Sequence, residues 1–314
     1  MATSELITPM FNEGGASGIG WSELDPLANC EKEHQYANVR QIYKPTTESP
    51  DALAVGAFVH AGRARWFADK QSTSAETWQR IVEDITRTRE GLPLPCSESA
   101  ERDALRYVQE FVEHYSVRAK PNIVAVEHML GPVNIGGDDT PRTGRLDDFG
   151  FYPDAGDKLA IGECKTTHSI TDTLMEYSLH GQPVLQRILW SLAPQGEATY
   201  GQVAGHVLDI IQKGYGGKKC SFMRIFVPLE PRVLEWGREY LVRLLNRRKE
   251  IGWDTPVVRN LKACTRLTGK ARVACKFQNL CQYGKTAALE YAFRDGRGLP
   301  EHTPETGRET APWD

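Results

Sequence analysis

The chain has 314 residues with a formal net charge of −3 at pH 7, and 40% of its residues are hydrophobic, enough for one large core or two modest ones. It has no apolar run long enough to cross a bilayer, and residues 1–20 lack the basic and apolar segments of a signal peptide, so we expect a cytoplasmic protein with no membrane partner. The net charge neither indicates nor excludes a nucleic-acid partner, because binding depends on where the basic residues lie.

The first part of the chain is predicted to be helical. Residues 1–50 form an irregular N-terminal segment with a short helix over 21–41. Apolar residues then recur at helical spacing in three segments: 54–70, 78–85 and 105–115. The third segment has Ser99 as its expected N-cap. We therefore expect a helical lobe over 51–120.

The central part is predicted to be rich in strands. Short alternating or apolar runs, separated by turn-forming glycines and aspartates, predict five strands: 123–130, 143–152, 159–166, 200–211 and 221–228. Helices are expected over 171–192, with a break near Gly181 and Pro183, and over 232–251. This order favours one α/β domain around a mixed sheet, with its core over 121–255.

One acidic–lysine constellation carries the clearest chemical signal. Asp147 lies within the predicted strand 143–152, and Glu163-Cys-Lys165 lies on the next. Positions i and i+2 of a strand share a face, so Glu163 and Lys165 point together, and a hairpin brings Asp147 beside Glu163. Two carboxylates make a hard-oxygen site suited to Mg²⁺ or Mn²⁺. The lysine can orient or deprotonate an attacking water, or neutralise developing phosphate charge.

Taken alone, the Glu-x-Lys triplet is a weak signal, because a chain of this size has about one by chance. Here it is the only triplet of its kind in the sequence. By itself it fits a catalytic pair and a solvated strand edge equally well. Asp148 is an alternative to Asp147, although strand alternation favours Asp147. Glu127, at the end of an apolar run, is a further acidic candidate.

Other motifs accompany the triplet in a fixed order. They are, along the chain, Gly56-Ala-Phe-Val-His60, Gly144-Arg-Leu-Asp147, Ile161-Gly-Glu163-Cys-Lys165 and Gln186-Arg-Ile-Leu-Trp190. With them the sequence resembles the RecB-like and Cas4-like branch of the PD-(D/E)xK nucleases, which has many phage-encoded members. Trp190 departs from the tyrosine that is usual there, and Gln182 competes with Gln186 for the glutamine position.

The resemblance implies a restriction-endonuclease-like fold: a mixed central sheet flanked by helices, with an N-terminal helical lobe and a cysteine-clasped C-terminal segment. It implies that His60, Asp147 and Glu163 ligate the metal. Lys165 would assist the nucleophile, and Gln186 would position DNA or the lysine. Some basic residues are expected to hold the DNA backbone: Arg63, Arg65 and Arg145.

The implied activity is exonucleolytic hydrolysis of DNA with free ends or single strands, in recombination or repair. The setting would be a bacterial or phage-infected host cell, with a recombinase or helicase as a further partner. The alternative is a catalytically silent, cysteine-clasped module that binds nucleic acid or acts as a scaffold. The intact acid–lysine set argues against that alternative, because a degenerate copy should have lost at least one member.

Seven cysteines in a cytosolic chain argue against a disulfide framework. Cys264, Cys275 and Cys281 cluster near the C-terminus, in the segment 256–295. Three thiolates cannot complete a tetrahedral site, and Cys30 is the natural candidate for the fourth ligand. The same family resemblance implies a structural [4Fe–4S] cluster, with Zn²⁺ as the alternative. The remaining cysteines are expected to be ordinary thiols: Cys96, Cys164 and Cys220.

The end of the chain, residues 296–314, is rich in proline, glutamate and glycine. Such a composition buries too little apolar surface to offset the entropy of ordering the chain. We therefore expect this tail to be disordered.

Overall fold

The computed structural model describes the following residues: 20–40, 42–43, 51–92, 94–179, 181–214, 218–228, 230–258, 260, 265–268, 271–275, 277, 281 and 292–293. The predicted tail over 296–314 lies outside them. The chain divides into two compact units. The first, here called the sheet unit, has three parts: Met1–Gly15, Thr47–Ile135 and Pro141–Arg238. The second, here called the terminal unit, also has three: Ala16–Thr46, Gly136–Thr140 and Glu239–Asp314.

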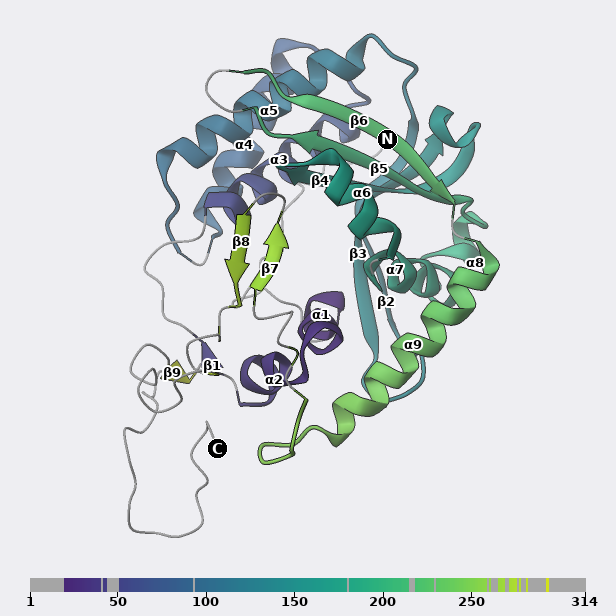
Figure 1. Ribbon diagram of the computed structural model, residues 1–314. Coiled ribbons are helices and arrows are strands. Elements are labelled where there is room, and N and C mark those ends of the chain that lie inside the picture. The colour runs from purple at the N-terminus through teal and green to yellow at the C-terminus, as the bar shows by residue number, and fades with distance from the viewer. Residues whose placement is uncertain are drawn as a thin grey trace. The chain divides into compact units, whose positions relative to one another are not determined.

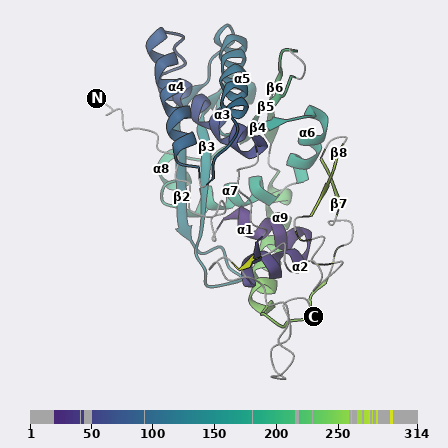
Figure 2. The ribbon, with the colours of Figure 1, turned by 90° about the vertical axis from the view of Figure 1, so that its left-hand side faces the viewer.

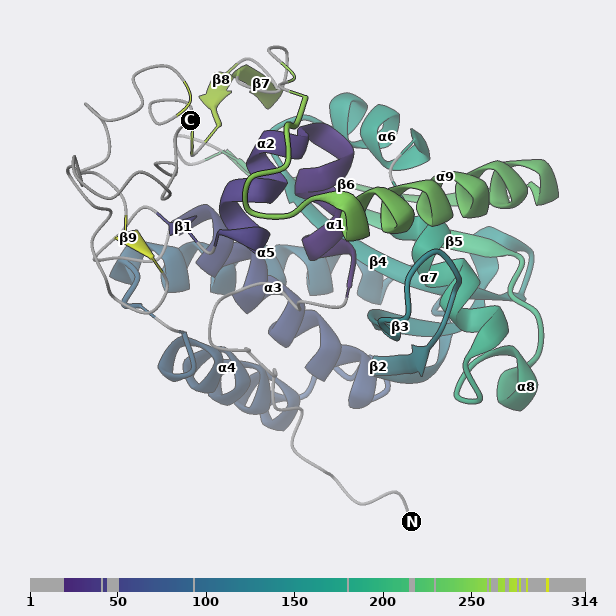
Figure 3. The same cartoon turned by 90° about the horizontal axis from the view of Figure 1, so that it is seen from below.

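The sheet unit is built on a five-stranded mixed sheet (Figure 1). In spatial order its strands are β2 (Asn122–Val133), β3 (Arg142–Tyr152), β4 (Lys158–Thr167), β5 (Gly205–Gln212) and β6 (Ser221–Pro228). Neighbouring strands are antiparallel except for β4 and β5, which are parallel. β2 and β6 form the two edges of the sheet (Figure 3). The prediction of an α/β domain with a mixed sheet is confirmed.

Parallel strands cannot be joined by a tight turn, so the chain crosses over between β4 and β5 through helices. These are α6 (Ile170–Leu179), α7 (Gly181–Leu192) and α8 (Glu197–Tyr200). The predicted break within 171–192 is confirmed. Gly181 and Pro183 lie in the first turn of α7, where a proline removes no intrahelical hydrogen bond.

Strand alternation gives the sheet two faces, and each is covered by different helices (Figure 2). On one face, Cys164 and Ile211 join the core formed with three helices: α3 (Asp51–Ala68), α4 (Ala75–Glu90) and α5 (Glu98–Ser116). On the other face, Leu208 and Ile210 pack against Tyr177 of α6. The residues predicted as a helical lobe thus share one hydrophobic core with the sheet.

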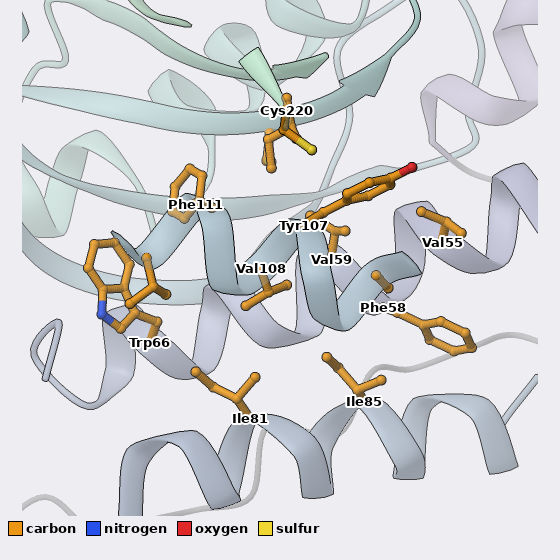
Figure 4. Packing of buried hydrophobic residues seen from close by; sticks show 14 of the residues in the cluster. Val55, Phe58, Val59, Trp66, Ile81, Ile85, Tyr107, Val108, Phe111 and Cys220 are labelled. Carbon is orange, nitrogen blue, oxygen red and sulfur yellow. The ribbon is translucent and has the colours of Figure 1, made fainter. Parts of the chain in front are cut away.

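The three helices of that core pack closely around Gly62. A Cβ atom at this position would lie 2.9 Å from Val108 of α5 and 3.3 Å from Ile81 of α4, so only glycine fits without displacing them. Ile81 and Ile85 of α4 point toward α3 and α5 (Figure 4). The spacing of these apolar residues is the helical period that the sequence displays.

Two local predictions are wrong. Ser97, not Ser99, caps α5: its backbone is extended and its Oγ accepts a hydrogen bond from the Ala100 N–H at 3.3 Å. Residues 200–204 are not part of a strand. Tyr200 ends α8, where its ring packs against Phe149 at 4.8 Å, and Gly201 then has a φ of +89°. The strand β5 begins only at Gly205.

The terminal unit joins segments from both ends of the chain. Strand β1 (Ile42–Tyr43) pairs with β9 (Ala292–Phe293), and β7 (Thr265–Thr268) pairs with β8 (Ala271–Ala274). The helix expected over 21–41 is divided into α1 (Trp21–Asn29), α2 (Glu31–His34) and a π-helical turn, Gln35–Val39. The interruption lies at Cys30, whose backbone is extended.

A buried side chain fixes the N-terminal part of this unit to its C-terminal part. The Gln35 amide donates hydrogen bonds to the backbone carbonyls of Gly252, Trp253 and Thr255, at 3.0, 3.2 and 2.9 Å. Helix α9 (Pro231–Glu250) begins in the sheet unit and ends in the terminal unit. None of the described helices is both long and apolar enough to span a membrane.

The aromatic rings packed around Phe111 in the helical core lead to a prediction about stability. Phe111 is fully buried, and its ring contacts those of Trp66, Tyr115 and Phe222. We expect Phe111→Ala to lower the free energy of unfolding by about 3–5 kcal/mol, because it leaves a cavity. In the control Val117→Ala the side chain is 85% exposed, and the change should stay within about 0.5 kcal/mol. Urea unfolding measures the free energy of unfolding of both variants. Equal losses would contradict the central place of Phe111 in this core.

Candidate active site

Helix α3 and strands β3 and β4 of the sheet unit bring the predicted ligands together. His60 Nδ1 lies 3.2 Å from Asp147 Oδ1. The other oxygen of Asp147 accepts a hydrogen bond from the Cys164 backbone N–H at 2.7 Å, which ties this carboxylate to β4. The register pairs Asp148 with Gly162, so Asp147 and Glu163 lie together on the opposite face. The predicted grouping of these residues is therefore present in the structure.

Three donors hold the carboxylate of Glu163. Lys165 Nζ donates to Glu163 Oε1 at 2.5 Å. Gln182 donates to the same oxygen and Gln186 to Oε2, both at 3.0 Å. The two glutamines lie one turn apart on α7, so they present their amides to Glu163 from one face of the helix. Both alternatives for the glutamine position thus contact the same carboxylate.

A third carboxylate joins this set from β2. Ligand atoms of Glu127, His60 and Asp147 all lie within 4.8 Å of one another, the one such grouping among the described residues. Glu127 has a φ of +49°, in the left-handed region that non-glycine residues avoid. Arg145 Nε lies 3.0 Å from its Oε2. The sequence marks Glu127 only as an acidic residue next to an apolar run.

Burial and neighbouring charges shift the pKa values of these groups. Burial raises the pKa of Glu127 to about 7; Arg145 opposes this shift and the charge of Asp147 adds to it. Burial disfavours a charged His60, but the charge and hydrogen bond of Asp147 outweigh it and raise the pKa of the imidazole. His60 in turn holds the pKa of Asp147 well below its usual range, against the effect of burial.

Lys165 stays protonated in this environment. Burial alone would lower its pKa, but the charges of Glu163 and Asp147 raise it above the usual lysine value. The ammonium is therefore a hydrogen-bond donor and a positive charge at neutral pH. It is not a group that readily removes a proton from water.

The donor set suits a divalent cation. One imidazole nitrogen and several carboxylate oxygens are ligands that Mg²⁺ and Mn²⁺ accept. The three members grouped most closely are His60, Glu127 and Asp147, with Glu163 on the neighbouring strand. A metal binds the deprotonated forms of these groups, so metal binding would compete with protonation of His60 and Glu127, whose pKa values are raised.

The structure separates Asp148 from the candidate site. It is fully buried on the other face of β3, where Arg63 donates to its Oδ2 at 2.6 Å and Tyr152 to its Oδ1. The expectation that Arg63 and Arg65 hold DNA is wrong. Arg63 is buried in ion pairs, and Arg65 is buried against Asp84, with Nε 2.7 Å from Oδ2. Both guanidinium groups are used inside the protein.

Trp190, which stands where a tyrosine is usual, is a core residue of α7. Its side chain is fully buried, its indole N–H donates to the Gly201 carbonyl at 2.9 Å, and its ring packs against Phe149. The sequence interpretation missed Asp209 and Arg224; Asp209 accepts hydrogen bonds from both Arg63 and Arg224. A charged residue within the apolar run of β5 was the available signal for Asp209.

The cysteines fall into two groups. Cys30, Cys275 and Cys281 belong to the terminal unit, and Cys264 lies outside the described residues. The Asn260 N–H points to Cys30 Sγ at 3.5 Å, and the rings of Tyr36 and Phe277 lie 5.5 Å apart. The other three lie in or against the helical core of the sheet unit: Cys96, Cys164 and Cys220.

Comparisons with known proteins identify no family. No protein-family model matches the chain, and no curated protein does. Among solved structures the chain is similar to one titled "Crystal structure of SSO0001", with 16% sequence identity and a TM-score of 0.28. The similarity covers 71% of this chain and 81% of the other. A similarity at this level defines neither fold nor function.

The raised pKa of Glu127 predicts a pH dependence of stability. The folded protein holds this proton more tightly than the unfolded chain, so without metal the wild type loses stability as pH rises from about 4.5 to about 7. Glu127→Gln lacks this loss. We expect its free energy of unfolding, relative to wild type, to rise by about 2–3 kcal/mol between about pH 5 and about pH 8 in EDTA.

Urea unfolding at the two pH values measures this difference. The control is Glu90→Gln, which changes an exposed glutamate at the end of α4. Its stability should follow that of the wild type at both pH values. If the free energies of unfolding of Glu127→Gln and wild type change equally between the two pH values, the pKa of Glu127 is not raised.

Proposed function

We propose that this protein is a metal-dependent DNA exonuclease of the PD-(D/E)xK type. The observation that carries the proposal is the meeting of His60, Asp147, Glu163 and Lys165 from three elements of the sheet unit. Their order along the chain is the order of the motifs in that family. A restriction-endonuclease-like arrangement of the sheet and helices is part of the same proposal.

Mg²⁺ or Mn²⁺ would be held by His60, Asp147 and Glu163, with Glu127 as a further carboxylate. When bound, the ion supplies Lewis-acid stabilisation of the phosphate and lowers the pKa of a water molecule. Lys165, protonated beside Glu163, donates a hydrogen bond to the attacking water or to a phosphate oxygen. Gln182 and Gln186 keep the Glu163 carboxylate in one orientation.

The substrate proposed is DNA with free ends or single strands. Arg145, whose Nε pairs with Glu127 while 42% of its side chain is exposed, would be the basic residue of the site that holds the phosphate backbone. Work on DNA ends fits a role in recombination or repair, in the cytoplasm of a bacterial or phage-infected cell. A recombinase or helicase would then act on the same DNA.

We further propose that Cys30, Cys264, Cys275 and Cys281 hold a [4Fe–4S] cluster, with Zn²⁺ as the alternative ion. Support comes from the terminal unit, in which Cys30 belongs to the same compact unit as Cys275 and Cys281. Four thiolates are the ligand set of such clusters. The cluster would have a structural role, because the candidate active site uses residues of the sheet unit.

Lys165→Ala tests the nuclease. We expect wild-type protein with Mg²⁺ or Mn²⁺ to degrade end-labelled linear DNA and to spare closed circles. Loss of the lysine charge should slow cleavage at least about 100-fold, since one preorganised donor contributes that much. The matched control is Lys158→Ala, an exposed lysine on the same strand, which should retain full activity. No cleavage by anaerobically purified wild type would leave the nucleic-acid-binding or scaffold alternative ahead.

Cys30→Ser tests the cluster. Anaerobically purified wild type should contain about four iron atoms per chain together with sulfide, and the variant should lose most of both. Cys96→Ser, a thiol of the helical core, is the control and should keep them. The measurements are iron, sulfide and zinc analysis. One zinc per chain in place of iron would establish the zinc alternative.

A further inference from the structure

A network of buried charges lies on the side of β3 and β4 opposite to Asp147 and Glu163. It joins Arg63 of α3, Asp148 of β3 and Asp209 of β5 with Arg224 of β6, and all of these side chains are at most 3% exposed. The two arginines balance the two aspartates. The network therefore connects the helix that bears His60 with three strands of the sheet.

The hydrogen bonds of this network leave little freedom to its members. Arg63 Nη1 donates to Asp148 at 2.6 Å, while its Nε and Nη2 donate to Asp209 at 3.1 and 2.8 Å. Arg224 donates to both oxygens of Asp209, at 2.7 and 3.0 Å. The planar guanidinium group of Arg63 thus bridges two strands in a geometry that a lysine cannot reproduce.

The network is linked to the candidate site through adjacent residues. Arg63 follows His60 by three residues, so both lie on the same side of α3. Asp148 follows Asp147 directly, so the two carboxylates point to opposite faces of β3. The contact between His60 and Asp147 at 3.2 Å and that between Arg63 and Asp148 at 2.6 Å therefore clamp the same helix to the same strand.

Gly162, which has no side chain, leaves space for the Asp148 carboxylate. Asp148 pairs with Gly162 across the ladder, and a Cβ atom at that position would overlap the Asp148 carboxylate and the Tyr152 hydroxyl. The glycine before Glu163 in the Ile161-Gly-Glu163 motif thus has a physical reason. It lets the Asp148 side chain lie flat over the neighbouring strand.

Stability is a poor explanation for such a network. Removing charges from water costs several kcal/mol per ion, and apolar replacements of buried ion pairs are often as stable. A hydrogen-bonded guanidinium–carboxylate pair does fix the distance and orientation of the two groups that it joins. We propose that the Arg63–Asp148 ion pair is a positioning device that holds His60 and Asp147 at metal-binding distance. This inference rests on the part of the proposed function in which these two residues bind a divalent ion.

The test measures Mn²⁺ binding without DNA, from the electron paramagnetic resonance signal of free Mn²⁺. In Arg63→Met/Asp148→Asn the charge balance is kept and the pair is removed. The matched control is Arg65→Met/Asp84→Asn, which removes a buried pair from the same helix that leads to α4 and not to the sheet. We expect the Mn²⁺ dissociation constant to rise at least about tenfold in the first variant and less than about twofold in the control.

A second variant, Arg63→Lys, keeps the charge and loses the bridging geometry, and it should also weaken Mn²⁺ binding. Urea unfolding of all variants separates stability from metal affinity. The inference is overturned if the Arg63 variants bind Mn²⁺ as wild type does, if the control weakens binding equally, or if wild type binds no Mn²⁺. Wild type that binds Mn²⁺ and cleaves no DNA would overturn the nuclease proposal and leave this inference standing.

Discussion

The alternation of side chains along β3 is the constraint on which the candidate site depends. Asp147 and Asp148 are adjacent, so the geometry of an extended chain sends them to opposite faces of the sheet. One aspartate meets His60, and the other meets Arg63 from the same helix. A register shift of one residue would exchange them and place Asp147 among buried groups of the core. The pairing of β3 with β4 therefore decides which carboxylate is available for chemistry.

Acidic and basic side chains of the site partly offset one another before any ion binds, and a pKa of about 7 leaves Glu127 partly protonated near neutral pH. Three carboxylates, Glu127, Asp147 and Glu163, face three basic groups, His60, Arg145 and Lys165. This balance explains how three acidic side chains can be gathered at low exposure. A divalent cation would compete with protonated His60 and with the Arg145 guanidinium for the same oxygens. Metal affinity should therefore increase with pH, as His60 and Glu127 lose their protons.

Local patterns predicted the parts of the structure that depend on neighbouring residues. The strand period placed Glu163 and Lys165 on one face, and proline chemistry placed the break before α7. Arg63 was misassigned because its partners, Asp148 and Asp209, are 85 and 146 residues away. Nothing near Arg63 in the sequence separates a buried arginine from an exposed one. The left-handed backbone of Glu127 also depends on tertiary contacts.

The terminal unit depends on contacts between segments that are far apart in the sequence. Strands β1 and β9 pair through two residue pairs separated by about 250 residues, and closing such a loop costs about 5 kcal/mol beyond a constant term. Hydrogen bonds between the same segments offset this cost at about 1 kcal/mol each: those of Gln35, two from Arg40 to the Trp253 carbonyl and two from Arg247 to Glu31. Thiolate–metal bonds from Cys30 to the C-terminal cysteines would close the same loop far more strongly. The proposed cluster would thus add to a closure that these contacts already make.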